Sequence, residues 1–176
     1  MKFTETKIRG VFIIEPEPRE DSRGYFARIF AKEELQKVGV DFSIAHINRS
    51  LSKEKGTIRG MHYQVKPMEE DKIVQCLAGK IFDVVLDLRR GSKTFGQWTS
   101  TILDPKNKNM MLTPKGCAHG IQTLEKDSLI EYFASQIFSS HHERGVRYND
   151  PKFNIDWPIK DAIVSEKDVS WEFFEK

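Results

Sequence analysis

Short apolar runs, each broken by turn-forming residues, dominate the pattern of hydrophobic and polar positions along the chain. The runs cover residues 11–14, 25–30, 72–77, 81–88, 95–103, 109–113, 119–125 and 128–138. This rhythm of strands and turns predicts an all-β sandwich or barrel. Residues 32–38, rich in Lys, Glu and Leu, have the composition of a short helix. The polar stretch from Gly145 onward predicts loops and short helices that wrap around the barrel.

Alternation in residues 81–89 places polar side chains on one face of a strand. The two faces carry Phe82, Val84, Leu86 and Leu88 on one side, and Asp83, Val85, Asp87 and Arg89 on the other. A half-polar face is usually solvated, but it can also line a barrel that holds a ligand. Lys72 shares a face with Val74 and Cys76. If that face points inward, Lys72 is a buried amine close to a carboxylate such as Asp83.

Two histidines lie in segments that could carry chemistry. Strict alternation would place Arg59 and His62 on opposite faces of a strand, whereas a β-bulge at Gly60 would bring them together. His119 follows a turn that contains Pro and Gly, a common place for functional residues. Taken singly, each histidine has an ordinary alternative as a surface or hydrogen-bonded side chain.

The same segments lack the usual motifs for a metal site or a catalytic nucleophile. Barrels of the cupin type commonly bind metal through a His-x-His pair, but residues 62–64 are His-Tyr-Gln, and Gln is a poor ligand for zinc or iron. Glu69 or Glu70 could supply an acid, while His141 and His142 lie in a polar loop. The sequence contains no Gly-rich phosphate loop and no G-x-S-x-G motif. We therefore predict no metal and no other cofactor.

Composition narrows the class of protein. Apolar residues make up 39% and charged residues 31% of the chain, and twelve Phe with three Trp argue against disorder. The net charge of +2, from 28 basic and 26 acidic side chains, indicates neither a nucleic-acid nor a membrane partner. The first residues lack the apolar run of a secretory signal, and Cys76 and Cys117 are predicted to be reduced and buried. We predict a single domain, residues 1–176, in the cytoplasm.

Short segments distributed along the chain give the most specific signal. They are residues 21–26, 48–50, 58–64, 72–74, 82–89, 96–98, 114–120, 132, 149–151, 155–158 and 165–168. In this order they resemble the dTDP-4-dehydrorhamnose 3,5-epimerase family over nearly the whole chain. The resemblance implies a cupin-like jelly-roll barrel with short peripheral helices that forms homodimers. It also implies a metal-independent epimerase of a nucleotide-linked 4-keto-6-deoxyhexose, most often found in cell-surface polysaccharide synthesis.

The resemblance further implies a role for individual residues. His62 matches the general base that removes a proton beside the ketone, and Asp168 matches the partner that fixes its tautomer. Tyr132 would return a proton from the opposite face, and Lys72 would stabilise the enolate oxygen. The substrate-binding positions implied are Arg23, Phe26, Arg28, His46, Asn48, Arg59, His119, Phe138, Glu143 and Lys167.

Three of these positions depart from the family pattern. Arg28 stands where Glu is usual, His46 where Gln is usual, and Phe138 where Tyr is usual. The nucleotide end of the site is therefore altered, while the acid–base set is intact. Two alternatives follow: a 3- or 5-monofunctional epimerase, acting on a CDP- or GDP-linked sugar if the base differs, and a non-catalytic barrel that binds a sugar nucleotide.

Overall fold

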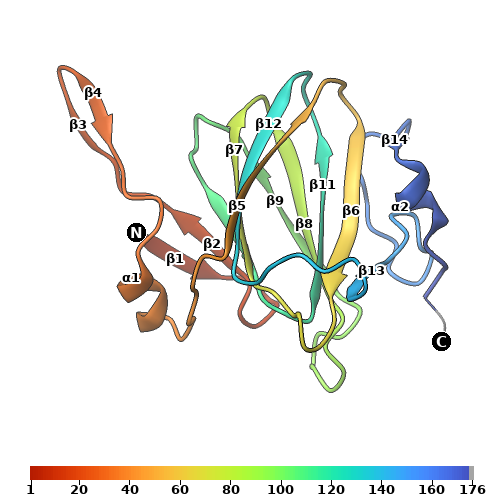
Figure 1. Ribbon diagram of the computed structural model, residues 1–176. Helices are drawn as coiled ribbons and strands as arrows, with labels where there is room; N and C mark the ends of the chain where they lie inside the picture. The colour runs from red at the N-terminus through yellow and green to blue at the C-terminus, as the bar shows by residue number, and fades with distance from the viewer. Residues whose placement is uncertain (175–176) are drawn as a thin grey trace.

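The computed structural model describes residues 1–174, and its core is a barrel made of two β-sheets (Figure 1). The first sheet has the order β1 (Lys2–Glu5), β2 (Phe12–Glu15), β10 (Met110–Thr113), β7 (Lys72–Ala78), β12 (Ser128–Ala134) and β5 (His46–Ser52). The second has the order β13 (Glu143–Gly145), β6 (Thr57–Gln64), β11 (Cys117–Thr123), β8 (Ile81–Asp87) and β9 (Trp98–Leu103), with β14 (Ile163–Val164) beside β6. The predicted all-β barrel is confirmed.

Apolar residues pack in three layers around these sheets. Between the sheets, residues of both contribute to one cluster, which includes Val74, Val85 and Ile121. A second cluster covers the outer face of the second sheet beneath the C-terminal segment, and a third covers the outer face of the first sheet beneath α1 (Lys32–Lys37). The helix predicted at 32–38 is thus confirmed, and it serves to bury Leu35.

The alternation in β8 resolves which face of this strand is inside. Val85 belongs to the cluster between the sheets, whereas Val84 and Leu86 belong to the outer cluster. The polar face therefore points into the barrel, and Asp83 is completely buried there. Of the two readings of this pattern, the barrel with a polar interior is the correct one.

One predicted strand is much shorter than its pattern suggests. Residues 25–30 alternate, but only β4 (Gly24–Phe26) is a strand, and it pairs with β3 (Arg19–Asp21) as a hairpin that projects away from the barrel (Figure 1). Beyond Phe26 the chain meets no partner strand, because it leaves the hairpin towards α1. Alternation alone cannot supply the backbone hydrogen bonds that a strand requires.

Both cysteines are free and buried, as predicted. Burial raises the pKa of Cys117 to about 12 and that of Cys76 to about 11, so both thiols stay protonated at neutral pH. Helix α2 (Glu166–Ser170) and α1 are short, and within residues 1–174 no helix could span a bilayer. The segment after Gly145 wraps the second sheet as loops, β14 and α2, as expected.

Candidate active site

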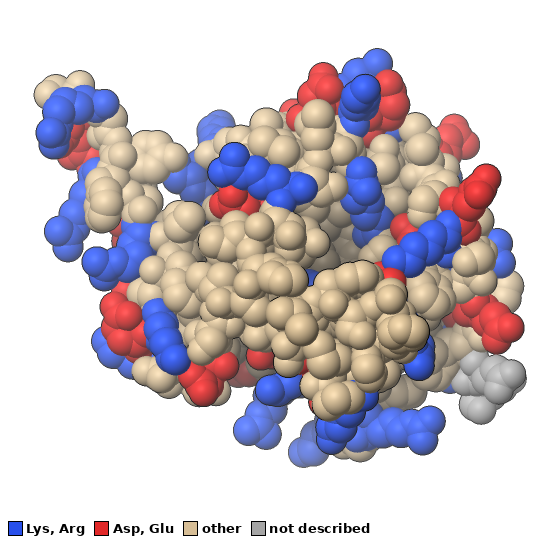
Figure 2. Space-filling view, in the orientation of Figure 1, with Lys and Arg blue, Asp and Glu red and all other residues tan. Residues whose placement is uncertain are grey.

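Two adjoining cavities lie inside the barrel and share three side chains, His62, Lys72 and Tyr132. The space-filling view shows a hollow on this face of the molecule, with Lys or Arg side chains at its rim (Figure 2). The first cavity, of about 310 Å³, is further lined by Ser50, Arg59, His119, Ile121, Ile130, Ser165, Lys167 and Asp168. The second, of about 390 Å³, is further lined by His46, Asn48, Tyr63, Gln64, Glu70, Ala134, Gln136, Phe138 and Glu143.

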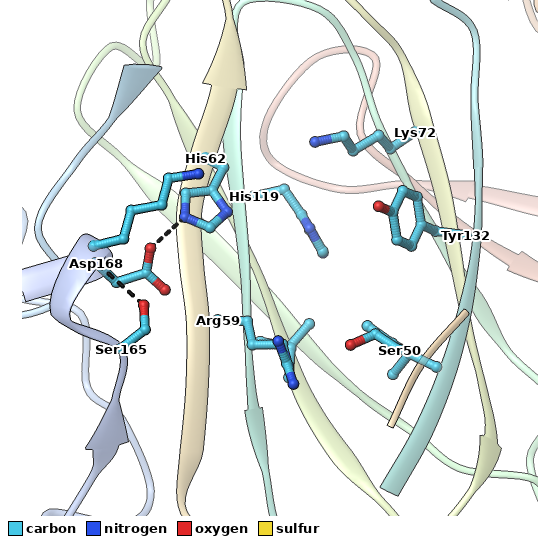
Figure 3. Close-up of a pocket in the computed structure, with 11 residues that line it drawn as sticks. Ser50, Arg59, His62, Lys72, His119, Tyr132, Ser165 and Asp168 are labelled. Carbon is cyan, nitrogen blue, oxygen red and sulfur yellow. Dashed lines mark hydrogen bonds and ion pairs between the residues drawn. The ribbon is translucent and has the colours of Figure 1, made fainter. Parts of the chain in front are cut away.

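A histidine–carboxylate pair forms one wall of the first cavity (Figure 3). His62 Nε2 lies 2.5 Å from Asp168 Oδ1, and the Asp168 side chain is only 5% exposed. Burial alone would raise the pKa of Asp168, but its hydrogen bond and charge interaction with His62, together with hydrogen bonds with the Gly60 amide and Ser165, hold the pKa below its usual value. With Nε2–H donated to this carboxylate, the lone pair on Nδ1 is free to accept a proton.

Helix α2 fixes Asp168 in this position. The hydroxyl of Ser165, the residue before the helix, accepts a hydrogen bond from the Asp168 amide at 3.2 Å. This is the ordinary side-chain cap of a helix start, and it places the carboxylate in the first turn. Asp168 also accepts a hydrogen bond from the Gly60 amide at 3.4 Å, which ties α2 to strand β6.

Of the two alternatives for Arg59 and His62, the structure shows the β-bulge at Gly60. His62 pairs with His119 and Arg59 pairs with Ile121, so two residues of β6 oppose the single residue Gly120 of β11. Arg59 and His62 consequently line the same cavity. A Cβ at Gly60 would lie 2.5 Å from the Gly120 Cα, so only glycine permits this approach of the two strands.

Lys72 points into the barrel, as expected, but the carboxylate beside it is Glu70. Lys72 Nζ lies 2.8 Å from Glu70 Oε1, and the two side chains are 15% and 9% exposed. The suggested neighbour Asp83 is wrong, because Asp83 lies in the opposite sheet and binds His119 Nε2 at 2.9 Å. Glu70 precedes strand β7 and is therefore close to Lys72 in sequence as well as in space.

Tyr132 and Lys72 lie across the cavity from His62 (Figure 3). Tyr132 comes from strand β12, and its neighbour Val74 in β7 faces the same interior. Burial, reinforced by the negative charge of Glu70, raises the pKa of Tyr132. The phenol therefore carries its proton at neutral pH and can act as a proton donor.

Seven of the ten predicted substrate-binding residues line these cavities. They are Arg59, His119 and Lys167 in the first, and His46, Asn48, Phe138 and Glu143 in the second. Lys167 Nζ lies 2.6 Å from the Glu143 carboxylate, so one ion pair links residues of the two cavities.

The other three lie on or beside the hairpin, apart from both cavities. The Arg23 side chain is 88% exposed and pairs with Asp21, and Phe26 is 68% exposed. Arg28 lies 3.9 Å from Glu33. Within a single chain, the structure does not bring these residues to the site.

Nine residues that line the cavities were not among the predicted site residues, and three of them show what the sequence could and could not signal. Ser165 carried a usable signal, because Ser165 and Asp168 have the spacing of a helix cap. Ser50 lies two residues after Asn48 on β5, so alternation places both on one face. Glu70 was weighed only as a metal ligand, and its contact with Lys72 depends on the course of the loop before β7.

The side chains considered for metal binding or for a thiol nucleophile have other roles in the fold. The side chain of Gln64, which takes the place of the second histidine in the His-x-His pattern, donates to the backbone carbonyls of Met68 and Ile137. Among the described residues, no three His, Cys, Asp or Glu side chains form a group that could hold a metal ion. Cys117, beside His119 in sequence, has a protonated thiol and does not line either cavity.

A jelly-roll barrel whose interior places a histidine–carboxylate pair opposite a tyrosine, with cations around them, has the features of a cupin-like acid–base isomerase. Comparison with known protein families shows which family of isomerases this is. The family model for dTDP-4-dehydrorhamnose 3,5-epimerase matches residues 5–176, and the chain belongs to this family. It is therefore a carbohydrate epimerase.

Individual relatives agree with this assignment. The dTDP-4-dehydrorhamnose 3,5-epimerase of Sinorhizobium fredii is 39% identical over 97% of this chain and 88% of its own. The crystal structure of the Bacillus anthracis enzyme, with TDP and PPi bound, has a TM-score of 0.94 and 38% identity, covering 98% of this chain and 99% of that one. The Legionella pneumophila enzyme in complex with dTDP-4-keto-L-rhamnose has a TM-score of 0.90 and 36% identity, covering 97% and 90%.

Proposed function

We propose that this protein inverts carbons 3 and 5 of dTDP-4-dehydro-6-deoxyglucose by removing and returning protons beside the ketone. The observation that carries the proposal is the His62–Asp168 pair facing Tyr132 across one cavity. A base and an acid on opposite walls suit inversion, because the proton leaves one face of the sugar and returns to the other.

These groups suggest the sequence of proton transfers in one inversion. His62 Nδ1 takes the proton from the carbon beside the ketone, and the electron pair of the broken C–H bond moves to the keto oxygen. Lys72 donates a hydrogen bond to the enolate that results. Tyr132 then protonates the carbon from the opposite face and becomes a tyrosinate. Exchange with solvent returns His62 and Tyr132 to their starting states.

The same residues argue for a metal-independent reaction. Lys72 supplies positive charge at the developing oxyanion, which is the part a metal ion plays in other enolising enzymes. The activity is therefore expected to survive prolonged chelation. Loss of activity with a chelator, restored by one metal, would contradict this part of the proposal.

The cations around the first cavity suit the diphosphate of a sugar nucleotide. Arg59, which donates to Ser52 Oγ at 2.9 Å, and Lys167 lie near His62 and carry the charge that a diphosphate requires. His119 is oriented by the buried carboxylate of Asp83. Phe138 and His46 in the second cavity are then available to the nucleoside.

A homodimer would bring the remaining predicted residues to a site. We propose that the β3–β4 hairpin of one copy places Arg23, Phe26 and Arg28 at the cavity of the other. The hairpin projects from the barrel (Figure 1), and it exposes the large apolar side chain of Phe26 to solvent. Apolar surface of this kind is often covered by a partner. Strand β5, at the edge of the first sheet, also exposes Ile47 and Leu51, and charged side chains are sparse on this side of the molecule (Figure 2). Light scattering of the purified protein measures this state directly.

The identity of the nucleotide base depends on the role of Arg28. Arg28 can only donate hydrogen bonds, so it suits the acceptor edge of cytosine or guanine better than the ring N–H of thymine. If Arg28 instead stays with Glu33, as in the single chain, thymine is bound mainly by stacking on Phe26 and Phe138. Affinities of dTDP, UDP, CDP and GDP for the wild type and for Arg28→Glu separate these two cases. If the order of nucleotide affinities is unchanged, with dTDP bound most tightly by both proteins, Arg28 does not select the base.

Incubation with a panel of 4-keto-6-deoxy sugar nucleotides in heavy water tests the reaction itself. Deuterium at both carbons 3 and 5 supports the proposed activity, and deuterium at one carbon supports a monofunctional epimerase. Tight binding with no exchange of any substrate would favour a non-catalytic binding barrel. A cytoplasmic location, consistent with two reduced thiols, can be checked by cell fractionation.

A further inference from the structure

Among residues 1–174, Glu70 is the one carboxylate that contacts a member of the proposed acid–base set and has no role in the mechanism above. We propose that Glu70 is a positioning residue, which holds the Lys72 ammonium in the cavity wall and acts through its charge on Tyr132. The inference rests on the proposed function and adds a residue to it.

The contact with Lys72 is short and shielded from water. Glu70 Oε1 lies 2.8 Å from Lys72 Nζ, and both side chains are largely buried. A free lysine has four rotatable bonds, so an ammonium without a partner would sample many positions. One hydrogen bond to Glu70 leaves the other two N–H groups of Lys72 for the keto oxygen. The ion pair therefore positions the Lys72 ammonium and still leaves N–H groups that can bind the substrate.

The loop that carries Glu70 is anchored at both ends, so the carboxylate is held in place. Gln64 binds the Met68 carbonyl at 2.9 Å, which fixes the start of the loop. After Glu70, the Asp71 amide donates to Ser135 Oγ at 2.8 Å, and the Asp71 carboxylate accepts from the Lys115 amide at 2.9 Å. These neighbours make Glu70 part of a rigid wall.

The charge of Glu70 also acts on Tyr132. After burial, Glu70 is the largest influence that raises the pKa of this phenol. The other groups that face Tyr132 come from several strands: Glu143 of β13 raises the pKa as well, whereas Arg59 of β6 and a hydrogen bond with Asn48 of β5 lower it. His62 and Lys72 line the same two cavities. Removing the Glu70 charge shifts this balance towards the tyrosinate.

Three variants test the proposal. Glu70→Gln keeps the shape and a carbonyl that accepts a hydrogen bond from Lys72, but it removes the charge. Glu70→Ala removes both. Glu69→Gln is the matched control, because it makes the same charge change one residue away on the same loop, at a side chain that lines neither cavity.

The first measurement needs no substrate. Ultraviolet titration of tyrosinate, with the matching Tyr132→Phe protein subtracted, isolates the ionisation of Tyr132 among the four tyrosines. We expect its midpoint to fall by about half a pH unit or more in Glu70→Gln and to stay unchanged in Glu69→Gln. An unchanged midpoint in Glu70→Gln would overturn the electrostatic part of the proposal, whatever the activity of the protein.

The second measurement is the rate of deuterium exchange into dTDP-4-dehydro-6-deoxyglucose as a function of pH. We expect Glu70→Ala to lose about tenfold or more, because Lys72 is no longer held, and Glu70→Gln to keep the rate within about threefold at neutral pH. The release of inverted product is measured over the same pH range, because this step needs the Tyr132 proton, and its alkaline limb should move to lower pH in Glu70→Gln. Equal losses in both variants with an unmoved alkaline limb would show a merely structural role. An inactive wild type would instead contradict the proposed function, and the tyrosinate titration would still decide the role of Glu70.

Discussion

The barrel cavity and the β3–β4 hairpin carry two halves of one predicted site in very different physical settings. In the cavity, His62 and Asp168 are held 2.5 Å apart, and the carboxylate is shielded from water. On the hairpin, Arg23 and Asp21 form a similar charged pair at 2.7 Å, but their side chains are 88% and 52% exposed. Buried pairs are held by their surroundings, whereas exposed pairs contribute little and respond to salt.

This difference indicates how the work is divided. The proposed acid–base chemistry requires closely positioned groups, and one chain carries all the residues proposed for it on its barrel strands and α2. Recognition of the nucleotide can be left to groups that become ordered on binding. The following predictions test this division, from the largest expected effect to the smallest.

The His62→Ala variant should lose solvent exchange by about a hundredfold or more, while dTDP binding stays nearly intact. The reason is that the base is removed and the cationic residues around the diphosphate remain. Deuterium exchange and a dTDP titration measure the two properties. His141→Ala, in an exposed loop outside both cavities, is the control and should exchange at the parent rate. Exchange by His62→Ala at close to the parent rate would remove His62 from the role of base.

The Asp168→Asn variant should lower the exchange rate by roughly tenfold to a hundredfold. The amide can offer its N–H to Nε2, which would place the ring proton on Nδ1 and block the base. Circular dichroism should show a retained fold. A near-normal exchange rate at neutral pH would show that the carboxylate does not set the tautomer.

The Tyr132→Phe variant should separate the two halves of the reaction. Deprotonation by His62 continues, so substrate protons exchange with solvent, but release of inverted product falls by about tenfold or more. Mass spectrometry and NMR of the same reaction report the two rates. If both fall equally, Tyr132 only positions the sugar.

Arg23→Ala should raise the KM by about tenfold with a smaller effect on kcat, because this side chain is proposed to bind substrate rather than to move protons. A mixed dimer of the Arg23→Ala and His62→Ala variants tests directly which chain's site the hairpin serves. If the hairpin serves the other copy, a mixed dimer has one site with both defects and one with neither, so activity returns on refolding the two together. Failure to restore activity in a proven mixed dimer would place the hairpin at the site of its own chain.

The smallest effect concerns stability at acid pH. Hydrogen bonds hold the folded-state pKa of Asp168 below its usual value despite burial, so its carboxylate stabilises the fold above about pH 4 and loses this effect as the pH falls through the lower value. Asp168→Asn should therefore reduce the free energy of unfolding by about 1–3 kcal/mol at pH 7 and by less near pH 2. Asp21→Asn, on the exposed hairpin, should show no such pH-dependent difference in urea unfolding.

Much of the barrel and its interior follows from local pattern. Alternation in β8 separated a polar face from an apolar one and left open whether the polar face lines the barrel, as it does, and the glycine between Arg59 and His62 offered the bulge that brings them together. Both inferences succeed because they concern neighbours within one strand, whose geometry the backbone fixes.

The failures concern contacts between segments. Lys72 was assigned a neighbour in Asp83, but the fold gives Asp83 to His119 and Glu70 to Lys72. The strand expected over residues 25–30 lacks a partner after Phe26. Strand pairing and loop course depend on long-range packing, which periodicity does not report.

The link between Asp168 and His62 also sets an order in which the active protein can be made. The two residues are 106 positions apart, and Asp168 comes from α2, after all the strands of both sheets. A nascent chain on the ribosome can therefore assemble its barrel strands before the carboxylate exists. Partly synthesised chains, or chains clipped before Ser165, would have a base without its orienting partner. The proposed activity would thus require that synthesis has passed α2, because this helix supplies both Asp168 and Lys167 to the cavity.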